Sequence, residues 1–92
     1  MRRITIKKVV INDVEIQARW VRKRFGKRSE QRMLRRLASV LKVLQSYPFI
    51  WVRNPELELY RVTVDYHSSL IYTVGKDEVR VLQLVHNRRR ST

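Results

Sequence analysis

The chain has 92 residues, with 21 Lys and Arg against 8 Asp and Glu, a formal charge of +13 and a pI near 11.3. This length accommodates one hydrophobic core, so we expect a single domain over residues 1–92, and 43% hydrophobic residues with only two Gly and two Pro argue against disorder. The absence of Cys excludes disulfides, thiolate catalysis and Cys-based zinc sites, and two His cannot form a tetrahedral metal site, so we expect no metal and no cofactor.

The N-terminal sequence MRRITIKKVV lacks the apolar stretch and the small-residue cleavage site of a signal peptide. No apolar run approaches the ~20 residues that span a bilayer. We therefore expect a cytoplasmic protein and no membrane partner. The positive charge predicts a polyanionic partner, the alternatives being a membrane surface or an acidic protein that neutralises the same residues.

The first elements predicted along the chain are a strand and a helix. Ile4 and Ile6 alternate with polar residues, which indicates a strand over about residues 3–10. Asn12 or Asp13 can cap a helix that Gly26 terminates. Trp20 is expected in the core beside the apolar face of this helix, which comprises Val14, Ala18, Val21 and Phe25, the alternative being that Trp20 stacks on a base.

A second helix is predicted from a cap at Ser29 to Ser46, since apolar residues repeat at helical spacing between them. The loop between the helices is short, so they should pack as an antiparallel hairpin. The hairpin also holds most of the charge, because residues 1–46 carry a net +11 and residues 47–92 a net +2.

Tyr47-Pro48 ends the second helix, because proline disfavours helical geometry in the residue before it. Residues 49–58 show no periodicity and are interpreted as an irregular crossing. Three strands are predicted to follow, separated by turns, over residues 59–64, 69–74 and 79–85. The expected fold is α+β, in the order β-α-α-β-β-β, with an antiparallel sheet and a helical hairpin.

Several short motifs in the C-terminal half form a pattern of their own: Arg61 on a strand, Leu70-Ile71-Tyr72-Thr73-Val74, Lys76-Asp77-Glu78, and Val79-Arg80-Val81-Leu82 running to His86. This pattern resembles the C-terminal half of toxins of the RelE/ParE superfamily, and the preceding strand and hairpin match that family in order and length. The resemblance implies a compact toxin with a small curved sheet, neutralised by a cognate antitoxin that wraps it.

The resemblance implies one of two activities. RelE-like toxins, including the YoeB-like and YafQ-like branches, enter the ribosome and cleave mRNA without a metal, whereas ParE-like toxins inhibit DNA gyrase without known hydrolytic chemistry. We predict the ribosome-dependent mRNA endonuclease, with the gyrase inhibitor as the alternative. A non-toxic RNA-binding module is a third hypothesis.

RNA cleavage of this type needs a base for the 2′-hydroxyl proton, cations for the phosphate charge and an acid for the leaving oxygen. His86 is the candidate acid or base, because histidine as a residue type can exchange protons near neutral pH and because this one aligns with the C-terminal His of the YoeB-like and YafQ-like toxins. Arg61 and Arg88 are candidate phosphate clamps, and Glu58 is a possible helper. The alternatives are a His86 that bonds only the backbone and an Arg61 that pairs with a nearby carboxylate.

Two departures from the family count against cleavage: Ser69 stands where YoeB-like enzymes carry an active-site Arg, and the RelE lysine cluster is replaced by a stretch with only Arg53. His67 is interpreted as a turn residue, and Trp51 could stack on a base. Further residues are predicted to contact nucleic acid: Arg53, Arg89, Arg90, Arg32, Arg35 and Arg36.

Overall fold

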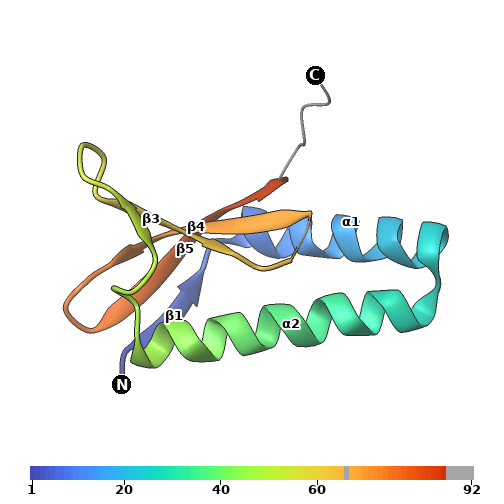
Figure 1. The fold of residues 1–92 in the computed structure, drawn as a ribbon, viewed down its shortest axis with the longest axis horizontal. Helices are drawn as coiled ribbons and strands as arrows, with labels where there is room; N and C mark the ends of the chain where they lie inside the picture. The colour runs from blue at the N-terminus through green and yellow to red at the C-terminus, as the bar shows by residue number, and fades with distance from the viewer. Residues whose placement is uncertain (66, 87–92) are drawn as a thin grey trace.

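The computed structural model describes residues 1–65 and 67–86 (Figure 1). Two helices follow the first strand, and four strands complete the described chain. The elements are β1 (Arg3–Ile6), α1 (Lys8–Phe25), α2 (Lys27–Ser46), β2 (Val52–Asn54), β3 (Leu59–Thr63), β4 (Ser68–Val74) and β5 (Glu78–His86).

The five strands form one mixed sheet in the order β1-β5-β4-β3-β2. Strands β2 to β5 pair antiparallel, whereas β1 pairs parallel with β5. The α+β prediction is confirmed, but the prediction of a wholly antiparallel sheet was wrong for β1. Alternation of apolar residues in a four-residue strand indicates a strand without indicating the direction of its neighbour. The Glu78 carboxylate supports this parallel pair, since it accepts hydrogen bonds from Thr5 Oγ1 at 2.8 Å and from the Arg80 guanidinium at 2.7 Å, and both lower its pKa.

The predicted helix starts were wrong by several residues. Strand β1 ends at Ile6, and α1 begins at Lys8, so Val9 and Val10 are helical and Val10 lies in the core. Neither Asn12 nor Asp13 is a cap, because both lie within the helix. Likewise α2 begins before Ser29, whose hydroxyl donates to the Phe25 carbonyl instead of capping.

One residue, Gly26, connects the two helices. Its φ of 98° and ψ of 170° place it in a region that is essentially restricted to glycine. A Cβ added there would meet nothing within 4 Å, so the backbone conformation and not the space requires glycine. The prediction that Gly26 ends the first helix is confirmed.

The main core lies between the helices and one face of the sheet. Tyr72 is fully buried in it, and its hydroxyl donates to the Pro48 carbonyl at 2.7 Å, which fixes the segment after α2 against β4. Burial raises the pKa of the Tyr72 hydroxyl. The buried members of this core are Val10, Leu44, Val62, Val64, Leu70, Tyr72, Val79, Val81 and Leu84.

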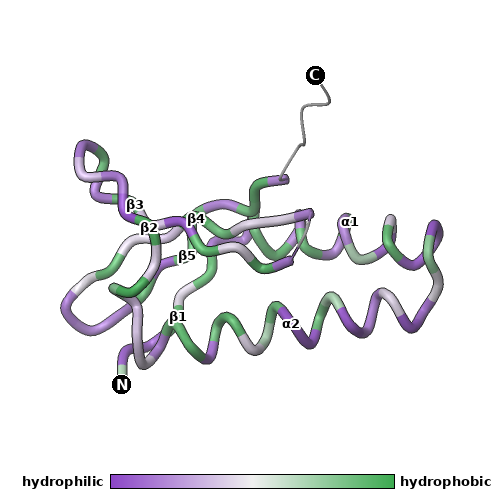
Figure 2. Tube along the Cα trace, in the orientation of Figure 1, coloured by the Kyte–Doolittle hydropathy of each residue, from purple (hydrophilic) through white to green (hydrophobic). Residues whose placement is uncertain are grey.

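A second, smaller core lies between the helices near Gly26 and consists of Ala18, Val21 and Met33. Figure 1 shows this part of the hairpin extending beyond the strands, and Figure 2 shows hydrophilic residues recurring along both of its helices. Because the helices pack there mainly against each other, one side of α1 has no cover. Trp20 lies on that side with 46% of its surface exposed, so the prediction that it is a core residue was wrong.

Candidate functional site

The sheet face that the helices leave open carries a row of side chains across its strands. Val62 and Leu70 lie in the core, so strand alternation places their neighbours Arg61 and Ile71 on the open face. The register then joins four residues across β2, β3, β4 and β5: Val52, Arg61, Ile71 and Gln83. Arg61 thus presents its charge near the middle of this row.

A shallow cleft of about 670 Å³ follows this row. The turn between β2 and β3 forms one wall of the cleft, where Asn54 Oδ1 accepts hydrogen bonds from the N–H groups of Glu56 and Leu57. Arg53 and Arg61 both line the cleft. The region predicted to be an irregular crossing therefore includes a short edge strand and an ordered turn.

Glu58 lies at the end of this turn and pairs with Arg53, their nearest side-chain atoms being 3.5 Å apart. Its side chain is 82% exposed. Its φ of 55° is in the left-handed region, which non-glycine residues rarely adopt and which costs about 1–2 kcal/mol. The structure thus pairs Arg53 with Glu58 at the β2–β3 turn, but it does not bring this pair together with Arg61, because Arg53 pairs with Tyr60 and faces the side of the sheet opposite to Arg61.

His86 lies on the other face of the sheet. It pairs with Ser68 and lies two residues after Leu84, so it shares the core face with Leu84. Gln83 and Val85, by contrast, line the open-face cleft. The cause is a β-bulge in β5, where Ile71 pairs with Gln83 and Tyr72 with Val81, leaving Leu82 as an extra residue.

The structure does not bring His86 to Arg61, because the bulge reverses the facing of the residues that follow it. Strict alternation from Val79 and Val81 would have placed His86 on the open face. Three further predicted residues, Arg88, Arg89 and Arg90, lie outside the described residues.

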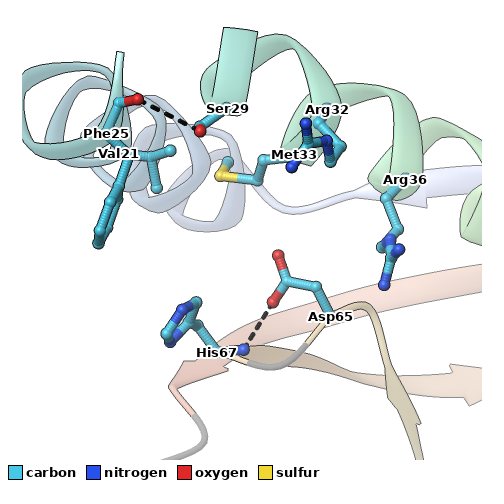
Figure 3. A pocket seen from close by; sticks show the side chains of 8 residues that line it. All are labelled: Val21, Phe25, Ser29, Arg32, Met33, Arg36, Asp65 and His67. Atoms are coloured by element: carbon cyan, nitrogen blue, oxygen red, sulfur yellow. Dashed lines mark hydrogen bonds between the residues drawn. The ribbon is translucent and has the colours of Figure 1, made fainter. Parts of the chain in front are cut away.

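A second cleft, of about 290 Å³, lies between the hairpin and the turn that joins β3 to β4 (Figure 3), and we call it the hairpin cleft. Arg32 and Arg36 line it from α2, one helical turn apart, and Asp65 and His67 line it from the turn. Asp65 Oδ1 accepts hydrogen bonds from the His67 and Ser68 N–H groups at 2.8 and 2.9 Å and from the Ser68 hydroxyl at 3.0 Å.

The prediction that His67 is a turn residue is confirmed, but no pattern in the sequence predicted that this turn faces the hairpin. The i, i+4 spacing of Arg32 and Arg36 was the only available signal for the second cleft. Arg35, the third predicted arginine of α2, is exposed and does not line it.

Two further residues considered in the sequence lie against or within the sheet. Trp51 is partly buried against the main core, and its indole N–H is buried with no hydrogen-bond partner among the described residues. Ser69 is buried on β4, where it pairs with Thr63 and Val85. Neither residue adds a cation to the open face.

In residues 1–65 and 67–86, no three His, Cys, Asp or Glu side chains lie close enough together to hold a metal ion. Neither helix in this part of the chain has the length and apolar character needed to cross a membrane.

Comparison with solved structures identifies the fold. The chain superposes on the chromosomal ParDE TA system from P. aeruginosa with a TM-score of 0.78, 13% identity and coverage of 94% of this chain and 96% of that chain. It superposes on the YoeB/ParE toxin from Agrobacterium tumefaciens with a TM-score of 0.63, 10% identity and coverage of 94% and 99%. For the YoeB-YefM complex from Staphylococcus aureus the values are 0.61, 12%, 91% and 94%.

No protein-family model matches the sequence, and no curated protein is similar enough to it to count as a match. The fold that the resemblance implied is thus confirmed by structure alone.

Proposed function

We propose that this chain, which has the RelE/ParE toxin fold, is the toxin of a type II toxin–antitoxin pair. The fold match extends over nearly the whole length of both chains, and a charge of +13 suits a target in the nucleic-acid machinery. Exposed apolar residues around the edge strand β2 suit an antitoxin partner that covers them. They are Tyr47, Phe49, Ile50, Val52 and Leu57.

Within this class, we propose that the toxin acts by binding its target without cleaving RNA, as a ParE-like inhibitor of DNA gyrase does. The observation that carries this choice is the position of the chain's two histidines. His67 lies at the hairpin cleft, and His86 faces away from Arg61. The open face then lacks the imidazole that was expected to protonate the leaving oxygen.

The ribosome-dependent mRNA endonuclease is the second candidate, and the Arg53–Glu58 ion pair at the turn that precedes the strand of Arg61 favours it. In this reading the Glu58 carboxylate takes the 2′-hydroxyl proton, and Arg61 holds the phosphate. His86 faces away from Arg61, so this reading requires the end of β5 to turn over before its imidazole protonates the leaving oxygen, with Arg88 as a further cation. The strained backbone of Glu58 is the kind of feature that active sites retain.

Induction of the chain in growing cells separates the two candidates. We expect arrested replication and altered plasmid supercoiling while mRNA stays intact and pulse-labelled translation continues at first. Early mRNA cleavage on ribosomes would contradict the binding proposal. Absence of any growth effect, or no rescue by co-expression of an acidic antitoxin encoded beside the gene, would contradict the toxin proposal itself.

A matched pair of histidine variants sharpens the test. We expect His86→Ala and His67→Ala both to remain toxic, because binding without cleavage needs neither imidazole. Loss of toxicity in His86→Ala alone, with normal circular dichroism, would support the endonuclease instead.

A further inference from the structure

The part of the hairpin that extends beyond the sheet holds most of the molecule's charge. Residues 19–36 contain nine Lys or Arg and one acidic residue, a net +8 out of +13. The acidic residue, Glu30, lies 3.9 Å from the Arg22 guanidinium. The buried members of the small core beneath are Ala18, Val21 and Met33, so none of these cations contributes a buried side chain to it. The charge is therefore available for a ligand.

Two aromatic rings lie exposed within this charge. Phe25 is 55% exposed and Trp20 is 46% exposed, and their ring centroids are 5.8 Å apart at an interplanar angle of 74°. The Arg24 guanidinium lies over the Trp20 ring, 5.8 Å from its centroid. Phe25 also lines the hairpin cleft together with Arg32 and Arg36 (Figure 3). Rings and cations therefore follow one another along the surface.

Two ring contacts and the lining of one cleft thus link five residues of the hairpin, which we call the hairpin track: Arg36, Arg32, Phe25, Trp20 and Arg24. Two cations one helical turn apart, with a rise of about 6 Å, begin it. Two rings follow, and a third cation ends it. The track belongs to the hairpin and to its cleft, whereas the candidate site around Arg61 belongs to the open face of the sheet.

We propose that the hairpin track is a binding site for single-stranded nucleic acid. Proteins that bind single strands combine cations that follow the phosphates with aromatic rings on which bases stack. Arg32 and Arg36 supply the first, and Phe25 and Trp20 the second, with Arg24 completing a cation–π pair. The site goes beyond the proposed toxin function, because it gives the chain a nucleic-acid contact that is independent of its target.

The charges around the track favour a nucleic acid over an acidic protein. Asp65 is the carboxylate that lines the hairpin cleft, and its Oδ1 is occupied by the backbone and hydroxyl groups of its own turn. The remaining cations are distributed over both helices, so a polyanion meets positive charge along its length. The half-exposed rings beside them suit bases, which present a π face at every nucleotide.

Fluorescence anisotropy with a labelled oligodeoxythymidylate of 12 nucleotides tests the proposal on the full chain. This probe has no 2′-hydroxyl and so survives any RelE-type cleavage. We expect salt-dependent binding, and we expect Arg32→Gln/Arg36→Gln to reduce the slope of log K against log salt by about 1.4, that is, 0.7 for each lost phosphate contact. The matched control Lys8→Gln/Lys42→Gln removes the same charge elsewhere and should retain most of the slope.

Trp20→Leu tests the stacking component. We expect affinity to fall roughly ten- to a hundredfold, with unchanged circular dichroism because the ring is exposed. In a Trp51→Phe background, the fluorescence of Trp20 should be quenched on binding. No binding of the probe, equal losses in the two double variants, or unchanged Trp20 fluorescence would overturn the proposal.

Toxicity in induced cells distinguishes the two proposals. If oligonucleotide binding fails while the chain still arrests growth, the hairpin track is wrong and the toxin proposal stands. If binding follows the track while growth is unaffected, the reverse holds.

Discussion

The sheet with its core and the outer hairpin, by which we mean residues 19–36, differ in packing and in charge. Nine buried hydrophobic side chains form the core at the sheet, whereas three form the core near Gly26. The outer hairpin carries a net +8 over residues 19–36, which opposes folding through self-repulsion. The difference teaches that packing at the sheet stabilises the fold, while the outer hairpin is a charged extension with a small core, whose composition does not favour stability.

The largest expected effect tests the sheet core. Leu44 is 0% exposed, so Leu44→Ala should lower the free energy of unfolding by about 3–5 kcal/mol through lost burial and a cavity. Met33→Ala, in the smaller core, should cost less because the exposed hairpin can close around the gap. Urea denaturation measures both, and an equal loss in the two variants would contradict the comparison.

Gly26→Ala tests the outer hairpin next. Its φ of 98° is strained for any residue with a Cβ, so we expect a loss of about 1–3 kcal/mol. The loss should be local. Hydrogen exchange should accelerate at amides near residue 26 while the strands keep their protection, and equal acceleration in the strands would show that the two regions unfold as one.

Tyr72→Phe probes the sheet core by a smaller amount. Removing the hydroxyl leaves the Pro48 carbonyl without its donor, which should cost about 1–2 kcal/mol. Because burial raises the pKa of Tyr72 above its ordinary value of 10.0, its stabilising effect is complete below pH 10 and is lost as the pH rises further.

Stability measured from pH 8 to 11 should therefore fall less steeply for Tyr72→Phe than for the unmodified chain. Tyr47→Phe, at an exposed position, is the control and should change little. If both variants retain the alkaline loss in full, Tyr72 is not its source.

The smallest expected effect has the opposite sign. Arg35→Gln removes an exposed charge from the crowded hairpin and should raise stability by up to about 0.5 kcal/mol, because self-repulsion falls. The gain should vanish at high salt, which screens surface charges. Thermal unfolding at low and high ionic strength measures it, and a destabilised variant would mean that Arg35 supports the fold.

Helical periodicity and alternation predicted both helices and the three C-terminal strands, because each buries one continuous apolar face. The same rules failed near Val9 and Val10, since an apolar pair at the boundary of a strand and a helix fits either period. They also missed β2, whose three residues are all exposed and so leave no apolar pattern.

The candidate site was predictable where it depends on residue type and not where it depends on register. Arg53, Glu58 and Arg61 were selected from the sequence; Arg53 pairs with Glu58, and Arg61 lies on the open face. The position of His86 depends on the bulge at Leu82, which no local residue preference announces. Of the hairpin track, Arg32 and Arg36 were selected from the sequence, whereas Trp20 has the spacing of a core residue, and only the absence of cover over α1 exposes it.

The bulge at Leu82 makes strand length, and not residue identity, the determinant of which side chains reach the open face. A single-residue deletion there would exchange the two faces of the end of β5, turning His86 towards Arg61 and Leu84 away from the core. Two relatives with the same residues in β5 and a difference of one in their number would therefore present different chemistry to the same target. A sequence alignment that ignores this one-residue difference in the length of β5 would assign the histidine to the wrong face of the sheet.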